Sequence, residues 1–424
     1  MRKVSKFWLI FLALAALLLV LAVACEEEEE GTPTGTPAAT VTGTPASEGE
    51  VPGITDTEII LGMHGPLTGT FGAAYAPVIG GVEAYFRYVN AEEGGVCGRQ
   101  IVLKIEDDQY LPAGAVEAVK KLLDRDKVFA MIAGIGTAAH SAVWEDLNER
   151  GVPDLWIMSG AHKFGSEPEK YPWSVPLLPD YYIEGTIFGR YISENMAGKK
   201  VGILRQNDDW GDDVLAGLKN GLDPDKNELV SDQSYEITTV SIRSQVASLK
   251  AAGAEVVIAA STPPSTSQLI KEADRLGWHP QFFIDYVNSD PMMFLYVSPE
   301  LMEGVITLQA NKLSTWIDDP AVAEHHRIMS EYGDYPAGNF TLVGNGAALI
   351  TVEVLRRACD NLTRQGLMDA VHSLKDFQGD LTLPGITTDL SPTDHRGTEA
   401  MRMLRGHDGQ WEYFGEIIPF VEEE

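Results

Sequence analysis

The stretch Glu58-Ile59-Ile60-Leu61-Gly62-Met63 decides the fold of this chain, and Gly65-Pro66-Leu67-Thr68-Gly69 follows it after a single histidine. A short apolar run bounded by glycine and proline is typical of a buried strand that ends in a turn. Residues 78–90 then carry apolar side chains at helical spacing. The sequence therefore predicts a strand, a turn and a helix, the first half of a parallel βαβ unit.

The same alternation of strands and helices continues along the chain in two successive series. In the first series we expect strands at 101–106, 128–133 and 155–158 and helices at 113–123 and 138–150. In the second series we expect strands at 200–204, 255–259, 282–284 and 304–308 and helices at 181–195, 212–222, 244–252, 265–276, 321–332 and 342–360. Short apolar runs between helices are typical of parallel sheets with helices on both faces. The sequence therefore predicts an α/β protein of two lobes, each with its own sheet.

The N-terminal residues have the three parts of an export signal in the usual order. Basic residues come first, an apolar run fills 7–24, and small residues precede Cys25. This order is typical of a signal peptide, and the cysteine resembles the lipobox of bacterial lipoproteins, although Ala22 stands where leucine is usual. We expect residues 1–24 to be removed and Cys25 to carry a lipid. An uncleaved transmembrane helix is the alternative, because the apolar run approaches the ~20 residues that span a bilayer.

Residues 25–53 are expected to form a disordered tether between the lipid and the folded body. The segment begins with five glutamates at 26–30 and continues with Gly, Thr, Pro, Ala and Ser. It lacks the large apolar side chains whose burial would offset the entropy of ordering. The whole chain is 44% hydrophobic and 22% charged, which is ordinary for a globular protein. The remaining length, 54–420, is enough for two domains.

The charge of the chain excludes one class of partner. The formal net charge is −30, whereas nucleic-acid binding depends on clustered Lys and Arg. We therefore expect no nucleic-acid partner. The same charge disfavours electrostatic docking on a membrane, which leaves the lipid on Cys25 as the anchor.

Two further cysteines, Cys97 and Cys359, lie in the predicted body. We expect two separate thiols, with a disulfide as the alternative, because geometry decides whether the two sulfurs can meet. Two thiols do not make a metal site, so no metal is expected.

The loops before and after the predicted strands carry a resemblance to a known family. Besides the 65–69 turn they read Glu93-Gly94-Gly95-Val96-Cys97-Gly98-Arg99, Ile135-Gly136-Thr137 and Gln206-Asn207-Asp208-Asp209-Trp210-Gly211. In this order the motifs resemble the type I solute-binding proteins of ABC importers, in the family of the leucine/isoleucine/valine-binding proteins. The resemblance covers about 54–420. It implies the type I periplasmic binding protein fold, with two Rossmann-like lobes, parallel central sheets, three hinge crossings and a ligand cleft between the lobes.

The resemblance also implies a division of the chain and a function. With crossings near Pro176, Gln309 and Ile386, lobe 1 comprises 54–176 plus 309–386 and lobe 2 comprises 177–308 plus 387–424. The protein would be a monomeric, extracytoplasmic receptor, anchored to the cell membrane as a lipoprotein and delivering a small molecule to an ABC permease. The expected ligand is a branched-chain or other amino acid, or a related carboxylate or amide.

Candidate ligand-binding residues in the first lobe follow predicted strands, because ligands bind beyond the carboxyl ends of parallel strands. Thr137 precedes a helix, where its hydroxyl and the free backbone N–H groups suit a carboxylate or carbonyl oxygen. In the family a hydroxyl at this position binds the ligand carboxylate; an ordinary N-cap is the alternative. Ser159, Gly160 and Ala161 follow the fourth strand, where the family uses a backbone carbonyl and a nearby hydroxyl. A glycine turn is the alternative there.

The remaining candidates include aromatic residues and one departure from the family pattern. Phe71 and Trp210 match family positions whose rings lie against the ligand; surface packing is the alternative for Trp210. Tyr286 stands where the amino-acid-specific members place a glutamate that pairs with the ligand ammonium, and Thr262 replaces an aromatic residue. Because a tyrosine is a weaker partner for an ammonium than a carboxylate, an amino-acid ligand would need another acid such as Asp285.

No catalytic pattern is present in the sequence. Glu324-His325-His326 lacks the HExxH spacing of zinc enzymes, and the body has no G-x-S-x-G elbow, phosphate loop or dinucleotide fingerprint. We therefore expect neither enzymatic activity nor a cofactor. A ligand sensor without transport and a secreted hydrolase with an unrecognised acid/base pair are the alternatives.

Overall fold

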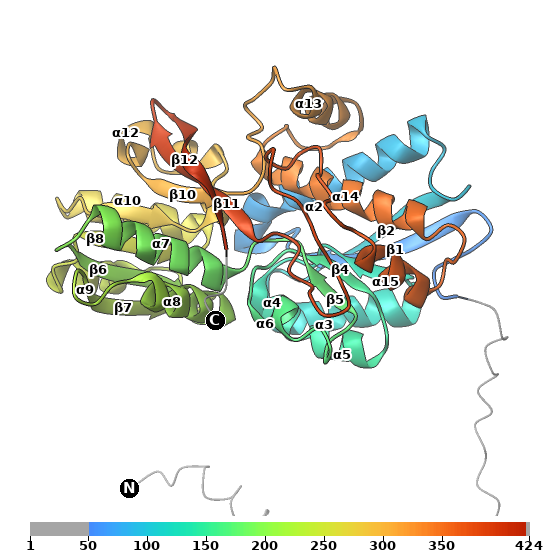
Figure 1. Cartoon of the computed structure of the whole chain (residues 1–424), viewed down its shortest axis with the longest axis horizontal. Coiled ribbons are helices and arrows are strands. Elements are labelled where there is room, and N and C mark those ends of the chain that lie inside the picture. Colours follow the sequence, from blue (N-terminus) through green and yellow to red (C-terminus); the bar gives the residue numbers. More distant parts are fainter. Residues whose placement is uncertain (1–50, 421–424) are drawn as a thin grey trace, which may run out of the picture. The chain divides into compact units, whose positions relative to one another are not determined.

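Two β-sheets organise residues 51–420, the part of the chain that the computed structural model describes (Figure 1). One sheet has five strands and the other has seven. The predicted signal peptide, Cys25 and nearly all of the predicted tether lie outside the described residues.

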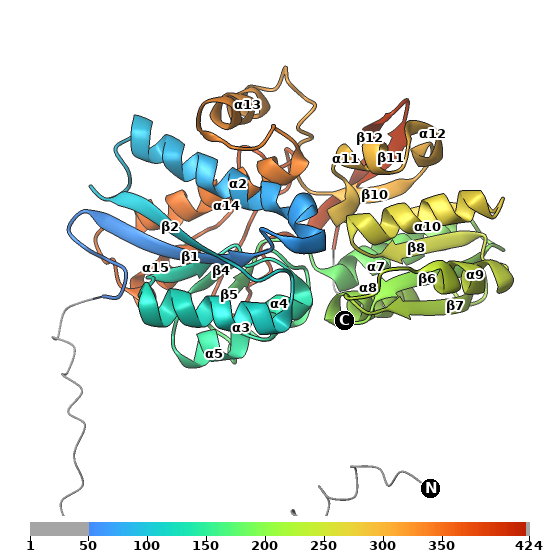
Figure 2. The same ribbon diagram turned by 180° about the vertical axis from the view of Figure 1, so that it is seen from behind.

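The first sheet is parallel throughout, with the strand order β2-β1-β3-β4-β5. Its strands are β1 (Glu58–Gly65), β2 (Gln100–Asp107), β3 (Ala130–Ile132), β4 (Asp154–Ile157) and β5 (Ser174–Pro176). Its connections hold α2 (Gly69–Glu92), α3 (Pro112–Lys120), η1 (Lys121–Arg125), α4 (Thr137–Ser141), α5 (Trp144–Glu149) and α6 (Lys163–Ser166). Helices α2 and α3 lie on opposite sides of this sheet (Figure 2). Successive side chains of β1 point to opposite faces, so Ile59 and Leu61 pack with α2 residues and Ile60 packs with α3 residues.

The second sheet has the order β12-β11-β10-β9-β8-β6-β7. Its parallel strands are β6 (Lys200–Gln206), β7 (Glu228–Tyr235), β8 (Val256–Ala260), β9 (Gln281–Ile284) and β10 (Ile306–Gln309). An antiparallel hairpin of β11 (Ala400–His407) and β12 (Gln410–Pro419) extends the sheet beyond β10. The helices of this part are α7 (Tyr181–Asn195), α8 (Asp209–Gly221), α9 (Arg243–Ala251), α10 (Pro263–Arg275), η2 (Tyr286–Asn288), α11 (Met292–Tyr296) and α12 (Pro299–Met302). The predicted α/β class with two mainly parallel sheets is confirmed.

Between β10 and β11 the chain returns to the first sheet, where it forms α13 (Pro320–Tyr332), α14 (Asn339–Arg357) and α15 (Arg364–His372) (Figure 1). Helix α14 packs against α2 at glycine positions that allow the backbones to approach closely. A Cβ at Gly81 would lie 2.3 Å from the Thr341 oxygen, and one at Gly344 would lie 2.1 Å from the Val78 oxygen. The side-chain amide of Asn345 donates to the Gly81 carbonyl over 2.7 Å. The predicted crossing points near Pro176, Gln309 and Ile386 stay predictions.

A disulfide joins Cys97 to Cys359, so the prediction of two separate thiols is wrong. Cys97 precedes β2, and Cys359 follows the end of α14. The packing of α14 against α2 brings two positions 262 residues apart to a Cα–Cα distance of 5.3 Å, within the range that a disulfide needs. Spacing in the sequence carries no information about this approach.

Several elements differ from those expected from the sequence. Helix α2 begins at Gly69 rather than 78, and the helix expected at 138–150 is divided into α4 and α5. The pattern missed β5, β7, α15, the short helices, and the β11–β12 hairpin. Strand β7, Glu-Leu-Val-Ser-Asp-Gln-Ser-Tyr, lies at the sheet edge, and most of its side chains are exposed or half-buried. Such an edge strand lacks the continuous apolar run by which the central strands were recognised.

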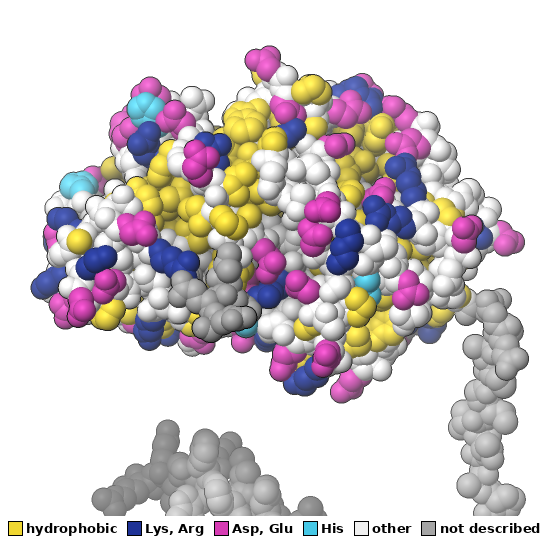
Figure 3. All heavy atoms as spheres, in the orientation of Figure 1, with side chains coloured by type: hydrophobic (Ala, Val, Ile, Leu, Met, Phe, Trp, Pro, Cys, Tyr) yellow, Lys and Arg dark blue, Asp and Glu magenta, His cyan; other side chains and the backbone are white. Residues whose placement is uncertain are grey.

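Acidic and basic side chains are interspersed on the face drawn in Figure 3. This distribution is typical of a solvated surface rather than of a patch that binds polyanions. Within residues 51–420, no helix has the length and apolar composition needed to cross a membrane.

Candidate ligand-binding site

A cavity of about 120 Å³ lies where segments from the two sheets meet. Segments that follow strands of the first sheet supply Tyr110 and Thr137, the first residue of α4. Segments that follow strands of the second sheet supply Trp210, in the first turn of α8, and Tyr286, the first residue of η2. Because parallel strands end at the same edge of their sheet, both groups are brought to one place. The N-terminal end of α14 contributes Asn339 and neighbouring residues to the wall.

Three stacked rings form the wall on the side of the second sheet. Tyr181, the first residue of α7, stacks on Trp210 and on Tyr286, with ring centroids 5.5 Å apart in each pair. Their interplanar angles are 29° and 24°. All three side chains are nearly fully buried. The stack therefore presents a fixed aromatic surface to the cavity.

A second aromatic group forms the opposite wall. Tyr75 of α2 lies 5.3 Å from Tyr110 and 5.9 Å from Phe340, measured between ring centroids. Phe71 packs behind Tyr110 at 4.7 Å. Burial raises the pKa of the Tyr75 and Tyr110 hydroxyls well above the usual range, so both stay protonated and can donate hydrogen bonds.

Thr137 supplies a hydroxyl at the start of α4. Its Oγ1 lies 2.7 Å from Oγ of Ser159, which also accepts from the backbone N–H of Ala161 over 3.2 Å. Gly136, directly before Thr137, has φ = 100°, and a Cβ there would lie 2.4 Å from the Tyr110 ring. Glycine is therefore needed at this position, because only it fits both the backbone conformation and the ring.

Buried carboxyl groups support the stacked rings from behind. Asp285 accepts from Nε1 of Trp210 over 2.6 Å and from the backbone N–H of Val287 over 2.9 Å. Glu184 of α7 accepts from the backbone N–H of Tyr286 over 2.8 Å. Burial, reinforced by the charge of Asp285, raises the pKa of Glu184 well above its usual range. These two acids thus hold the rings in position through their hydrogen bonds.

A chain of buried polar side chains lies beneath the other wall. Asp108 contacts His64 at 2.7 Å, His64 contacts His140 at 2.9 Å, and His140 contacts Asp154 at 2.8 Å. The second oxygen of Asp108 accepts from the backbone N–H of Tyr110 over 2.7 Å. His140 belongs to α4, the helix that Thr137 begins. The chain therefore fixes two cavity-lining residues from below.

The predicted site residues divide into those that line the cavity and those that do not. Thr137, Trp210 and Tyr286 line it. Six others do not line it; they are Phe71, Ser159, Gly160, Ala161, Thr262 and Asp285. Phe71, Ser159 and Asp285 support lining residues through the contacts above. Direct ligand contact by any of the nine stays a prediction.

Gly160, Ala161 and Thr262 serve other contacts. Gly160 and Ala161 line a separate small pocket, and a Cβ at Gly160 would lie 2.1 Å from the Pro179 oxygen. The backbone N–H of Thr262 donates to the Tyr235 hydroxyl over 3.1 Å, and its Oγ1 donates to Ser265 over 3.2 Å. These positions support backbone turns beside the cavity.

Sequence reasoning missed five of the aromatic residues that line the cavity, namely Tyr75, Tyr110, Tyr181, Phe340 and Phe377. Tyr110 could have been found, because it follows the strand predicted at 101–106, at the sheet edge where ligands bind. Tyr75, Tyr181 and Phe340 lie in helices, where an aromatic side chain carries no signal that separates a cavity wall from a core. Phe377 lies in the segment between α15 and β11, where the sequence predicts no element.

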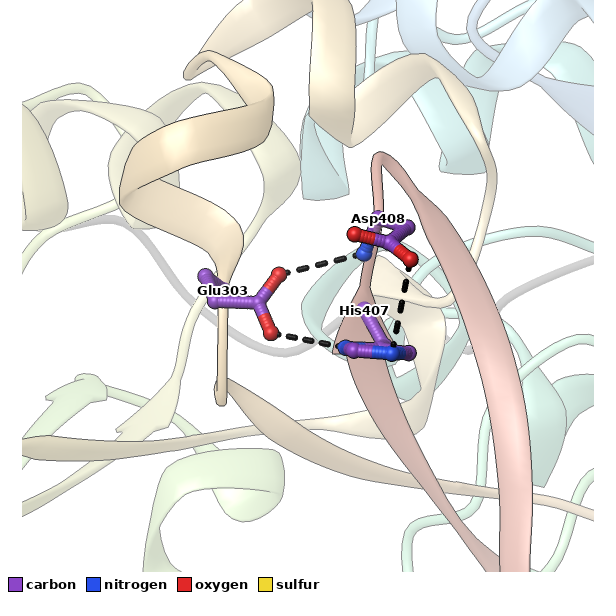
Figure 4. Close-up of side chains that lie close together, drawn as sticks. All are labelled: Glu303, His407 and Asp408. Carbon is purple, nitrogen blue, oxygen red and sulfur yellow. Dashed lines mark hydrogen bonds and ion pairs between the residues drawn. The ribbon is translucent and has the colours of Figure 1, made fainter.

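Only one group of potential metal ligands stands out within residues 51–420, and it lies away from the cavity on the surface (Figure 4). Glu303 contacts Nδ1 of His407 at 2.8 Å and accepts from the backbone N–H of Asp408 over 3.1 Å. His407 also contacts the Asp408 carboxylate at 3.5 Å. These contacts explain the cluster as a surface ion-pair network that joins α12 to the β11–β12 turn.

The family profile described as Periplasmic binding protein matches residues 58–410. An "Amino acid binding protein" of Pseudomonas aeruginosa is 25% identical over 293 residues, which are 67% of this chain and 75% of that protein. A solved branched-chain amino acid ABC transporter protein from Thermus thermophilus, with bound valine, superposes with a TM-score of 0.76 at 21% identity. That alignment covers 87% of this chain and 98% of the other.

A second solved structure is equally similar in fold. The fatty acid ABC transporter substrate-binding protein from Thermomonospora curvata has a TM-score of 0.76 and 22% identity, covering 87% of this chain and 94% of the other. The predicted type I periplasmic binding protein fold is confirmed by these superpositions.

Proposed function

Because the chain belongs to the periplasmic binding protein family, we propose that it is an extracytoplasmic receptor that captures one small molecule in the cavity and delivers it to an ABC permease. The observation that carries this proposal is the composition of the cavity wall. Residues from both sheets line the cavity, so a bound molecule would contact both at once. A ligand with contacts on both walls stabilises the closed arrangement over an open one by its differential affinity.

Closure would bring together two walls that are each already rigid. Trp210, Tyr181 and Tyr286 are held by buried hydrogen bonds and stacking on one side. Tyr110 and Thr137 are held by the polar chain and Gly136 on the other side. Binding to preorganised walls loses little side-chain entropy. A few hydrogen bonds and one aromatic clamp then suffice for a dissociation constant of about 1 μM, or ~8 kcal/mol.

Two observations support a location outside the cytoplasm. The N-terminal sequence has the pattern of a lipoprotein signal ending at Cys25. The Cys97–Cys359 disulfide is of the kind that persists in oxidising compartments. We propose that a lipid on Cys25 keeps the receptor at the membrane, which raises its effective concentration near the permease.

The relatives suggest more than one ligand class. The names of the similar proteins from Pseudomonas and Thermus refer to amino acids, and that from Thermomonospora refers to a fatty acid. An amino acid, a related carboxylate or an amide therefore remains the family-level expectation for this chain.

The receptor function is tested by recovering the natural ligand. The full chain, purified in mild detergent from the cells that make it, is denatured, and the released small molecule is identified by mass spectrometry. Returned to ligand-free protein, that molecule should bind with one-to-one stoichiometry and be recovered unchanged. Conversion of the molecule to a product would contradict the receptor function and support the hydrolase alternative.

A further inference from the structure

We propose that the cavity takes an uncharged aromatic molecule of about one ring with a hydrogen-bonding substituent, rather than a zwitterionic amino acid. The inference rests on the proposed receptor function and names the ligand class of the same site. Three properties of the cavity support this inference: the charges of its lining residues, their aromatic rings and its volume.

The wall offers an ionised ligand no cation and no buried carboxylate that is free of hydrogen bonds. None of the described residues that line the cavity is Lys, Arg or His, so a ligand carboxylate would find no cation. The acids among them are Asp290 and Asp380. Asp380 is exposed on the loop after Phe377 and is therefore solvated.

Asp290 is already used within the protein. It is 6% exposed, and its two oxygens accept from the backbone N–H groups of Met292 over 2.8 Å and Phe340 over 3.0 Å. It thereby stabilises the N-terminal turn of α14, whose orphan N–H groups and dipole favour an anion. Turning it toward a ligand ammonium would leave these buried donors unpaired.

Tyr286 and its neighbour Asp285 are also engaged within the protein. The Tyr286 hydroxyl donates to the Pro179 carbonyl over 2.7 Å. Asp285 is 1% exposed, and its two oxygens accept one hydrogen bond each, from Trp210 and from Val287. An ammonium bound against these rings would lose its hydration without gaining a buried counter-ion, a cost of several kcal/mol.

The surfaces that the wall does offer are aromatic. Seven lining residues carry aromatic rings, namely Tyr75, Tyr110, Tyr181, Trp210, Tyr286, Phe340 and Phe377. Tyr181 is stacked between Trp210 and Tyr286, so both of its faces are covered and it can offer a ligand only its edge. Ring edges carry positive partial charge, which repels a cation and attracts the face of an aromatic ligand. Such a contact contributes about 0.5–1.5 kcal/mol beyond area burial.

The space suits one ring. A volume of about 120 Å³ is close to the ~150 Å³ of an apolar cavity that accepts benzene. Thr137 lies on the wall, and within residues 51–420 its hydroxyl has one hydrogen-bond partner, Ser159. Its second position is available to a ligand carbonyl or hydroxyl.

The proposal is tested by isothermal titration of the full chain in mild detergent with five matched probes. Benzamide is aromatic and neutral; benzoate, benzylamine and phenylalanine carry a negative, a positive and both charges on the same ring. Valine is a zwitterion without a ring. We expect benzamide to bind at least tenfold more tightly than each of the other four.

A matched pair of variants locates the binding. Tyr75→Leu removes a ring from the cavity wall and should weaken benzamide binding at least tenfold. Tyr332→Leu removes a ring on α13, where the tyrosine hydroxyl contacts Glu92 outside the cavity, and should leave the affinity unchanged. Thermal denaturation of both variants establishes that they are folded.

The experiments distinguish a wrong ligand class from a wrong receptor function. Tighter binding of a charged probe, or no binding of benzamide, would overturn the ligand class. Equal loss of affinity in Tyr75→Leu and Tyr332→Leu would do the same, because the ring contact would not be specific. The receptor function fails only if the ligand-recovery experiment yields no intact small molecule that rebinds.

Discussion

Trp210 contributes both to the cavity wall and to the stability of the fold. The indole lies on the cavity wall, and it is also 1% exposed, stacked on Tyr181 and hydrogen-bonded to Asp285. A large residue with this burial supports the fold as well as the site, since its truncation to alanine costs about 3–5 kcal/mol of stability. A conservative change is therefore the sharper test.

We predict that Trp210→Phe weakens ligand binding about tenfold, or ~1.4 kcal/mol, because the shortened ring no longer donates to Asp285 and leaves that carboxylate without one of its donors. Titration calorimetry measures the affinity, and circular dichroism checks the fold. Trp316→Phe is the control, because Trp316 is 36% exposed and packs on Tyr413 outside the cavity. An unchanged affinity in Trp210→Phe would remove Trp210 from the site.

The carboxyl group of Asp213 should make the free energy of unfolding depend on pH. Burial raises the pKa of this carboxyl from 3.8 to about 7, opposed by a 2.9 Å hydrogen bond from the backbone N–H of His162 and reinforced by the charges of Asp180 and Asp209. Since the folded pKa lies above the unfolded value, folding favours the protonated form. The stabilising contribution is complete below the unfolded pKa and is lost as the pH rises through about 7.

We therefore expect the melting temperature to fall as the pH rises through this window, and to fall less in Asp213→Asn. The amide keeps an oxygen that accepts from His162 but has no proton to lose. Differential scanning calorimetry at a series of pH values makes the comparison. Parallel curves for the two proteins would show that Asp213 does not cause the dependence.

At the residue scale, the sequence indicates part of the cavity wall. Thr137, expected from its position after a strand, lies on the wall, as do Trp210 and Tyr286, which the family resemblance implies. Asp285 and Ser159 lie behind the wall, because adjacent loop residues point in different directions and the sequence does not record which one faces the cavity. Ligand contact by these residues stays a prediction. Tyr75 and Phe340 were missed because helix packing, not strand order, brings them there.

At the scale of secondary-structure elements, the central strands and most helices were predictable because apolar runs and helical spacing reflect burial on both sides of a sheet. The β11–β12 hairpin was not. Its strands alternate polar and apolar residues, as in Met401-Arg402-Met403, and lack a continuous apolar run. Strand β11 pairs with β10, which is distant in the chain, and β12 pairs only with β11. The path of α14 along α2 likewise depends on tertiary contact at Gly81 and Gly344.

The Cys97–Cys359 disulfide allows the packing of α14 along α2 to be tested. It links the segment before β2 to the end of α14 across 262 residues. We predict that the double variant Cys97→Ser/Cys359→Ser lowers the free energy of unfolding by about 2–4 kcal/mol, because the unfolded chain regains the entropy of an open loop. Guanidinium unfolding measures this change.

A reducing agent provides the internal control for the disulfide. It should destabilise the natural chain by a similar amount and have no effect on the double variant. Alkylation of Cys97 and Cys359 in the folded, unreduced protein would contradict the presence of the bond.

At the scale of the whole molecule, a receptor needs both an anchor, proposed at Cys25, and a ligand cavity. We predict that the natural chain partitions into the detergent phase and incorporates labelled fatty acid, and that Cys25→Ser abolishes the labelling. The variant should keep its ligand affinity, because the proposed anchor takes no part in binding. Labelling that persists in Cys25→Ser would place the lipid elsewhere.

The central claim is that the two sides of the cavity close on one ligand. The distance between a label on the first-sheet side and a label on the second-sheet side tests this claim most directly. Val116 on α3 of the first-sheet part and Val240 beside the second sheet are 48% and 89% exposed, so both accept spin labels after substitution by cysteine. Pulsed electron double resonance would compare Val116→Cys/Val240→Cys with and without the molecule recovered from the native protein. We predict that the ligand shifts a broad distribution of distances to one narrow population. An identical distribution with saturating bound ligand would contradict the account.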